Sequence, residues 1–246
     1  MTSDQGRQHS IAIDSDWDDE DDQELIDHCA AQPFPLLRLE AEEIARLPIG
    51  SLEVVFANTW TIQAMLPHYR VPDTYPSCFG PLYGRSIATK SKAECLAAAM
   101  PFFVKPTGNS KAFTGFVARD HIDLEVVRAS SDASFYVCDV VHFVSEFRVF
   151  LGPSPRVYGW VEATSFISGQ QNGATEPPPQ ALLDEIAQAN TIGFCVVDVG
   201  LTSSGSWCVV EVNPPFALSS YAWPIDKYFG FCRDAWQALS LQQPQE

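Results

Sequence analysis

The segment WCVVEVNPPF, residues 207–216, carries a carboxylate and an amide within an otherwise apolar run. Its valine, cysteine and tryptophan residues are typical of a buried strand, and the period of two places Glu211 and Asn213 on one face. The preceding predicted strand, over 194–200, holds Asp198 in a similar setting. The hairpin connection LTSSGS lets Asp198 lie either opposite Glu211 or diagonal to it, on the same face in both cases.

Two carboxylates this close in apolar surroundings repel each other, so either one is protonated or a cation lies between them. Carboxylate and amide oxygens suit Mg²⁺, which also takes waters and substrate phosphates as ligands. The sequence therefore predicts a magnesium site formed by Asp198, Glu211 and Asn213. An exposed hairpin face is the alternative, although the paired valines before each acid argue against it.

A second apolar segment, FFVKP, places Lys105 near the end of a strand. The polar, glycine-bounded segment TGNSKAFTG follows it and contains Lys111. A loop of this kind can close over phosphates, with lysines acting as point charges. A lysine at a strand end is otherwise a surface residue, so both interpretations remain open.

A third segment, FVSEFRVFL, places Glu146 and Arg148 on one face of a strand. An exposed ion pair would explain this pattern, but Phe150 would share the same face, which argues against simple exposure to solvent. Together the three segments predict a Mg-nucleotide cleft between two β-rich lobes.

The chain has 246 residues and a formal net charge of −16. A phosphate backbone would be repelled, so we do not expect general nucleic-acid binding. Acidic residues dominate from Asp14 to Asp27 and no basic residue interrupts them. Such a run repels itself, and it predicts an acidic, flexible arm over residues 1–33.

The seven cysteines are widely spaced, form no CxxC pair and occur partly in apolar runs. This pattern predicts buried free thiols in a reducing compartment. We see no signal peptide and no apolar run near the length of about 20 residues that a membrane span needs. The expected location is cytoplasmic, without membrane attachment.

Periodicity and turn residues predict the remaining elements. Residues 11–13 and 52–57 are expected to be strands, and 24–31 a helical turn. After residue 100 the predicted strands are 102–105, 115–118, 124–128, 136–143, 146–151 and 157–161. A helix is predicted over 181–192, and a final helix from Pro224 onward.

In chain order, the segments FFVKP, GFV, FVSEFRVFL, VVDVGL and VVEVN resemble the ATP-grasp superfamily. The segments LPIGSLEVVFA, YGRS, KAFTGFV, SEFRVF and VEVNPPFALSSYAW are similar to its clade named for two arginines and a lysine. The resemblance covers about residues 45–235. It would place the two arginines at Arg85 and Arg148 and the lysine at Lys105.

The fold that this resemblance implies is α+β. It is an ATP-grasp fold in which two β-rich α+β lobes clasp a nucleotide, preceded by a short N-terminal α/β region. The expected division of the chain is an acidic arm over 1–33, a small N-terminal α/β region over 34–100 and an ATP-grasp domain over 101–246.

The resemblance also implies ATP and Mg²⁺ as cofactors and gives each site residue a role. The expected nucleotide contacts are Lys105, Lys111, Glu146 and the adenine hinge around Asp139, Val141 and His142. The expected metal ligands are Asp198, Glu211 and Asn213. Arg85 and Arg148 are expected to be catalytic and to face the triphosphate or the acceptor carboxylate.

The activity that the resemblance implies is ATP- and Mg-dependent carboxylate–amine ligation, forming an amide through an acyl phosphate. The expected partners are a small-molecule or peptide carboxylate and an amine donor. Two alternatives use the same fold, namely a non-ligating ATP-binding module and a kinase-like phosphotransferase.

Overall fold

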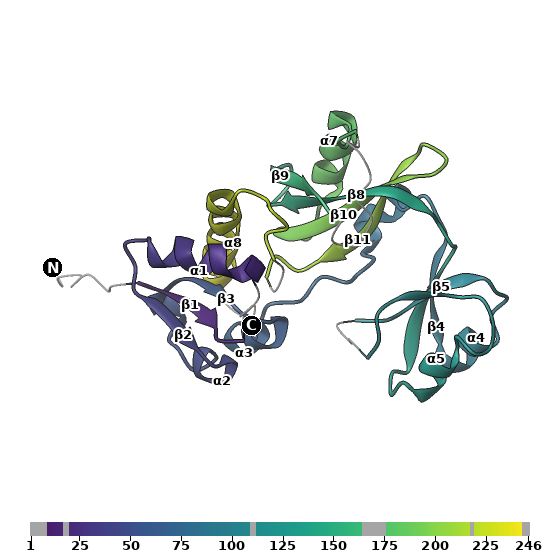
Figure 1. Cartoon of the computed structure of the whole chain (residues 1–246), viewed down its shortest axis with the longest axis horizontal. Helices are drawn as coiled ribbons and strands as arrows, with labels where there is room; N and C mark the ends of the chain where they lie inside the picture. Colours follow the sequence, from purple (N-terminus) through teal and green to yellow (C-terminus); the bar gives the residue numbers. More distant parts are fainter. Residues whose placement is uncertain (1–8, 17–19, 109–111, 164–175, 217–218, 243–246) are drawn as a thin grey trace.

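The computed structural model describes residues 9–16, 20–108, 112–163, 176–216 and 219–242, and its strands form three sheets (Figure 1). The strands are β1 Ser10–Asp14, β2 Leu36–Leu39, β3 Leu52–Phe56, β4 Ile87–Ser91, β5 Phe102–Pro106, β6 Phe116–Ala118, β7 Ser134–Cys138, β8 Phe143–Leu151, β9 Val157–Glu162, β10 Cys195–Thr202 and β11 Trp207–Asn213. The α-helices are α1 Glu20–Ala30, α2 Ala41–Ile44, α3 Thr59–Met65, α4 Lys92–Leu96, α5 Glu125–Ala129, α7 Gln180–Ala189 and α8 Ile225–Ser240. Two short 3₁₀ helices are η1 Ile49–Ser51 and η2 Ser77–Leu82.

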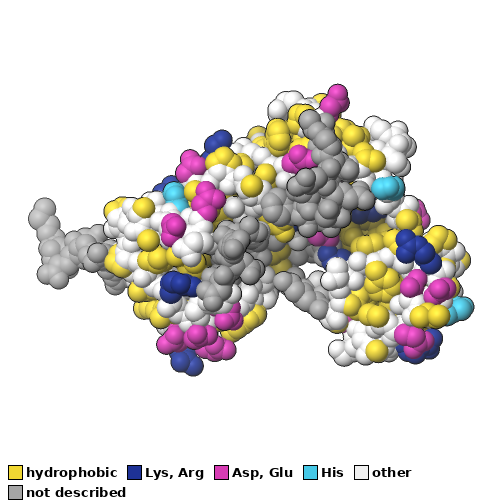
Figure 2. Space-filling view, in the orientation of Figure 1, with side chains coloured by type: hydrophobic (Ala, Val, Ile, Leu, Met, Phe, Trp, Pro, Cys, Tyr) yellow, Lys and Arg dark blue, Asp and Glu magenta, His cyan; other side chains and the backbone are white. Residues whose placement is uncertain are grey.

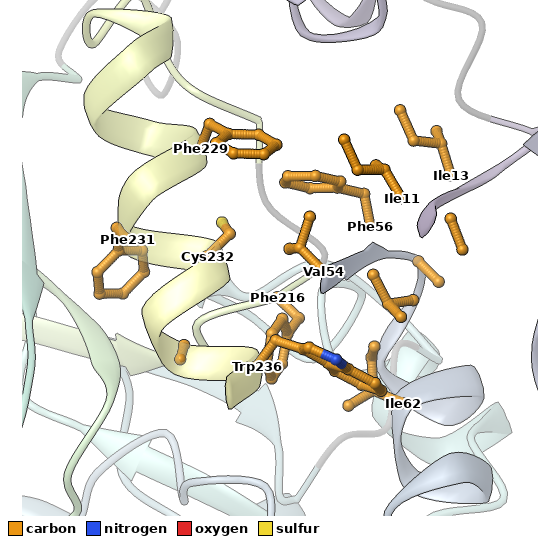
Figure 3. Packing of buried hydrophobic residues seen from close by; sticks show 14 of the residues in the cluster. Ile11, Ile13, Val54, Phe56, Ile62, Phe216, Phe229, Phe231, Cys232 and Trp236 are labelled. Carbon is orange, nitrogen blue, oxygen red and sulfur yellow. The ribbon is translucent and has the colours of Figure 1, made fainter. Parts of the chain in front are cut away.

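The first sheet is parallel and has the strand order β2-β1-β3. Its central strand, β1, is buried at Ile11 and Ile13, which lie in one core cluster with residues of α1, α3 and α8. The C-terminal helix α8 covers this sheet, and Figure 3 shows Phe229 and Trp236 of α8 near Val54 and Ile62. The first and last parts of the chain therefore share one core.

The prediction of a flexible arm over residues 1–33 is wrong for residues 10–30. Leu25 and Cys29 of α1 are buried in the same core as β1. Charge density suggested a solvated segment, but the apolar residues between the acids are sufficient to form a central strand and a packed helix. Residues 1–8 and 17–19 lie outside the described residues.

The second sheet is antiparallel and has the order β11-β10-β8-β9 (Figure 1). One face packs against α7 through a cluster that includes Leu183, Ile186 and Val197. At one end of the opposite face, Phe150 and Val196 join the core of the first sheet. The sheet is thus fixed to its neighbours on both faces, and the rest of the second face carries polar side chains.

The third sheet has the order β4-β7-β5-β6 and packs against α4 and α5. Because β4 and α4 belong to this unit, the boundary predicted at residue 100 falls inside it. The strand predicted over 124–128 is instead helix α5. Leu124, the residue before α5, and Val127 within it are buried three residues apart while Val126 is exposed, which is a helical and not a strand pattern.

The expected α+β architecture, with two β-rich lobes preceded by an N-terminal α/β region, is confirmed (Figure 1). On the face shown in Figure 2, acidic side chains gather around α2, whose first turn carries Glu42 and Glu43. All seven cysteines are free, and only Cys78 is not buried. No helix among the described residues is long and apolar enough to cross a membrane.

We predict that Ile13→Ala lowers the free energy of unfolding by about 2–5 kcal/mol, because it opens a cavity in the central strand of the first sheet. Ile13 is 0% exposed and Ile122 is 80% exposed. The matched control Ile122→Ala should therefore change the free energy of unfolding by less than about 0.5 kcal/mol. Urea unfolding measures both, and equal effects of the two variants would contradict the packed position of β1.

Candidate functional site

A β-bulge in β11 decides where its polar side chains point. Val199 of β10 pairs with Val209, but the next pair along the sheet is Asp198 with Glu211, so Val210 is an extra residue on β11. A bulge of this kind moves every later side chain to the other face. As a result Glu211 lies opposite Asp198 and shares its face, and Val209 points into the core below.

A buried ion pair occupies the centre of this face. Arg148 of β8 lies opposite Asp198. Its Nε donates to Oδ1 of Asp198 at 2.8 Å and its Nη2 donates to Oδ2 at 2.9 Å. Both side chains are nearly inaccessible, with exposures of 5% and 3%. This two-point geometry offsets the cost of burying two charges.

The pKa values of this pair reflect competing effects. Burial lowers the pKa of Arg148. The charge and hydrogen bonds of Asp198 raise this pKa by more than burial lowers it, so Arg148 remains a cation. Burial raises the pKa of Asp198, and Arg148 opposes that shift. Arg148 Nη1 is buried and has no hydrogen-bond partner among the described residues. Nη1 therefore keeps hydrogen-bonding capacity that Asp198 does not use.

The structure brings the three expected metal ligands together. Asn213 Nδ2 donates to Oδ2 of Asp198 at 3.0 Å and lies 3.5 Å from Oε1 of Glu211. The amide N–H thus lies between the carboxylates, where the sequence predicts a cation. Rotating the amide by half a turn would present its oxygen to the same space. The donor set therefore fits Mg²⁺.

These ligands would not complete the coordination of a metal ion. Within the described ranges, no three His, Cys, Asp or Glu side chains are grouped so that they could hold one. Two carboxylates and an amide would leave positions for waters and phosphates, which is the usual arrangement for Mg²⁺ at a nucleotide. The assignment of Asp198, Glu211 and Asn213 as ligands remains a prediction.

Lys105 connects the second and third sheets at this point. It lies on β5, and its Nζ is 2.5 Å from Oε2 of Glu211 on β11. Both side chains are about one quarter exposed. The predicted phosphate lysine and a predicted metal ligand therefore face each other across the two lobes. Lys111, the second predicted phosphate lysine, lies outside the described residues.

Glu146 lies on the same face of β8 as Arg148 and is paired with Gly200 in the sheet. Burial and the negative charges of Asp198 and Glu211 together raise the pKa of Glu146 to about 7, against the opposing effect of Arg148. Phe150, on the same face, is fully buried. The interpretation of this face as a simple exposed ion pair is therefore wrong.

The guanidinium of Arg85 makes contacts with the main chain that the sequence did not predict. Nη1 donates to the carbonyl oxygens of Tyr83 at 3.0 Å and Val209 at 2.8 Å, and Nη2 donates to that of Val210 at 2.6 Å. Three hydrogen bonds thus direct the guanidinium of Arg85 to main-chain carbonyls. Its predicted contact with a triphosphate or an acceptor carboxylate remains a prediction.

The predicted adenine hinge is the connection between β7 and β8. Asp139 pairs with Ser86 through two hydrogen bonds, because its Oδ2 accepts from the amide of Ser86 and its own amide donates to the carbonyl of Ser86. Val141 is half-buried and His142 is exposed. The segment links the second and third sheets, as a hinge would, and its role in binding a base remains a prediction.

Sequence reasoning did not identify Tyr221, which covers Arg148. The ring centroid of Tyr221 lies 4.0 Å from Cζ of Arg148. Tyr221 and Ala222 both have positive φ, of 52° and 61°, a conformation that costs energy for residues with a side chain. A second contact joins the same two segments. Trp223, two residues after Tyr221, stacks on Phe150, two residues after Arg148, with ring centroids 4.1 Å apart. A pattern based on polar residues could not find this contact, since its partners are far apart in the chain.

The loop before η2 also contacts both lobes. The carbonyl of Thr74 accepts a hydrogen bond from the amide of Val212 on β11, and Asp73 accepts one from the hydroxyl of Tyr136 on β7. Lys105 is the partner of Tyr136 in the third sheet. This loop therefore lies beside the candidate site.

A family model matches residues 82–230. It describes family 2 of the ATP-grasp domains in the clade named for two arginines and a lysine. The matched range contains all the site residues that the sequence predicts. A search of curated proteins found no match.

Solved structures show the same fold. An ATP-grasp RimK-domain protein from Sphaerobacter thermophilus has a TM-score of 0.58 at 16% identity, over 92% of this chain and 98% of that one. The ATP-grasp ligase PsnB, complexed with a minimal precursor, has a TM-score of 0.54 at 12% identity, over 94% and 99%. An N5-carboxyaminoimidazole synthase from Aspergillus clavatus, in complex with ADP and 5-aminoimidazole ribonucleotide, has a TM-score of 0.57 at 12% identity, over 97% and 79%.

We predict that the stability of the folded protein falls as pH rises from about 4.5 to about 7. Glu146 binds its proton more tightly in the folded state, with a pKa of about 7 against the ordinary 4.5. The stability that Glu146 contributes is complete below a pH of about 4.5 and is lost as the pH rises through about 7. Over this range the free energy of unfolding falls by up to about 1.4 kcal/mol per pH unit.

Urea unfolding across this pH range measures the effect of Glu146. The variant Glu146→Gln should lose this part of the pH dependence because it cannot ionise. The control Glu125→Gln alters an exposed carboxylate on α5 and should keep the wild-type profile. Identical profiles for wild type and Glu146→Gln would contradict the raised pKa.

Proposed function

The chain belongs to family 2 of the ATP-grasp clade named for two arginines and a lysine, and we propose that it is an ATP- and Mg²⁺-dependent carboxylate–amine ligase. In this reaction the terminal phosphoryl group of ATP passes to a carboxylate oxygen, and ADP leaves. An amine nitrogen then attacks the acyl carbon and forms the C–N bond. The bond between the acyl carbon and the phosphate oxygen breaks, inorganic phosphate leaves, and the amine nitrogen loses a proton.

The observation that carries this proposal is the group of polar side chains on one face of the second sheet. Asp198, Glu211 and Asn213 converge within hydrogen-bonding distance, and Lys105 reaches them from the other lobe. A core sheet has no structural need for these charges. The divalent cation of a bound nucleotide would interact with the carboxylates, and the phosphates of the nucleotide would interact with Lys105.

Each residue of the site has a distinct task in the proposed reaction. Bound Mg²⁺ would neutralise phosphate charge, and Asp198, Glu211 and Asn213 would hold it. Lys105 would exchange its contact with Glu211 for a phosphate oxygen. Arg148 would direct its remaining Nη1 donor at the transferred phosphoryl group or at the acyl phosphate, where charge develops.

The substrate class is proposed from the similar structures. One of them is described with a minimal precursor and another with a ribonucleotide, so their ligands differ while the fold is shared. We propose a small-molecule or peptide carboxylate as the acceptor and an amine as the donor. The seven free cysteines support a cytoplasmic, reducing location.

A hydroxylamine assay distinguishes the proposed ligase from the two alternatives. The full chain would be incubated with Mg-ATP, hydroxylamine and pooled amino acids or peptides. A ligase should form both ADP and hydroxamate, since hydroxylamine intercepts the acyl phosphate. ADP formation with a phosphorylated product and no hydroxamate would support a phosphotransferase. ATP binding without turnover would support a non-ligating module.

We predict that Glu211→Gln reduces Mg-dependent ADP formation by at least about 100-fold, because it removes a ligand charge with little change in volume. Circular dichroism and thermal unfolding should report an intact fold. The control Glu125→Gln makes the same chemical change on exposed α5 and should keep wild-type turnover. Full activity of Glu211→Gln would disprove the metal site.

A further inference from the structure

The bulge at Val210 is hydrogen-bonded to the side chain of Arg85. Nη1 of Arg85 donates to the carbonyl of Val209 and Nη2 donates to that of Val210, at 2.8 and 2.6 Å. These carbonyls belong to the extra residue and to the one before it. Nη1 also donates to the carbonyl of Tyr83, which ties the bulge to the end of η2.

The surroundings of Arg85 hold its guanidinium in this place. Its Cζ lies between 5.7 and 5.9 Å from the ring centroids of Tyr75, Tyr83 and Phe143. A planar group with its donors in fixed positions can reach two neighbouring carbonyls at once, whereas an ammonium acts as a single point charge. The site therefore suits arginine and would not suit lysine.

The bulge matters because it sets the direction of the next side chain. Without the extra residue, Glu211 would point to the face that carries Val209, into the core against α7. With it, Glu211 faces Asp198 and reaches Lys105. Bulges leave main-chain groups outside the regular ladder, and such groups need other partners. Arg85 provides them for two successive carbonyls.

We propose that Arg85 is a positioning residue that holds the β11 bulge and thereby directs Glu211 toward the metal. The proposal rests on the proposed function only in taking Glu211 as a metal ligand. Arg85 then acts through the backbone of β11 and without touching the phosphates. It follows that Arg85 determines the affinity for Mg²⁺, while metal-free nucleotide binding is independent of it.

The test compares Arg85→Lys and Arg85→Met with the wild type by calorimetry, using ADP with magnesium and ADP with a chelator. Both variants should need about 10- to 100-fold more Mg²⁺ for half-maximal enhancement of ADP binding, the usual effect of losing a residue that orients a metal ligand. ADP affinity in chelator should stay within about twofold of the wild type. Lysine should not rescue the function, because it cannot bind both carbonyls.

Two further measurements separate positioning from general damage. Hydrogen exchange without metal should be faster in the peptide covering 207–213 of both variants, and unchanged in the third sheet. In a Glu211→Gln background, Arg85→Met should cause no additional loss of Mg²⁺ affinity, because the two residues act in series. If Arg85→Met does not fold, Arg85→Lys carries the same test.

The control is Arg156, an exposed arginine whose Cζ lies 3.8 Å from the ring centroid of Tyr158. Arg156→Lys and Arg156→Met should change neither the Mg²⁺ dependence nor exchange in β11. Rescue by Arg85→Lys, an equal loss of ADP affinity with and without Mg²⁺, or unchanged exchange in β11 would each overturn the proposal. If the wild type binds no ADP, the proposed function fails, and the exchange measurement still tests the role of Arg85.

Discussion

One extra residue in β11, Val210, determines the character of the site. Side chains alternate along a strand, so a single insertion exchanges the two faces for every residue that follows. Val209 before it lies in the core, and Glu211 after it faces Asp198. The same strand can therefore contribute to the packing against α7 and, beyond the bulge, to a polar site on the opposite face.

Charge balance within the protein offsets the cost of gathering these charged side chains on one face. Arg148 neutralises Asp198 through two hydrogen bonds, and Lys105 neutralises Glu211 from the other lobe. Asn213 donates an N–H toward both acids. A divalent cation would take over the roles of Lys105 and Asn213, which would free the lysine for phosphate. The contact between the two lobes would thereby be linked to occupancy of the site.

Much of the second and third sheets could be predicted from the sequence, because the strands that flank the site are long and rich in β-branched residues. The charged residues within them were recognisable since each interrupts an apolar run. The helix α5 was missed because its Val126 and Val127 favour a strand locally, and burial three residues apart decided otherwise. The strand at residues 11–13 was predicted, but the adjacent acids led to its assignment to a flexible arm and not to the core.

The sequence by itself determined which side chains could form the site and that Glu211 and Asn213 share a face, since strand periodicity is a local property. It also determined the family, through the order of short motifs. The tertiary structure alone decided that a bulge brings Glu211 opposite Asp198, that Arg148 pairs with Asp198 and that Arg85 binds the bulge. The two arginine contacts join segments separated by 50 or more residues, and no local pattern encodes the approach of two distant backbones.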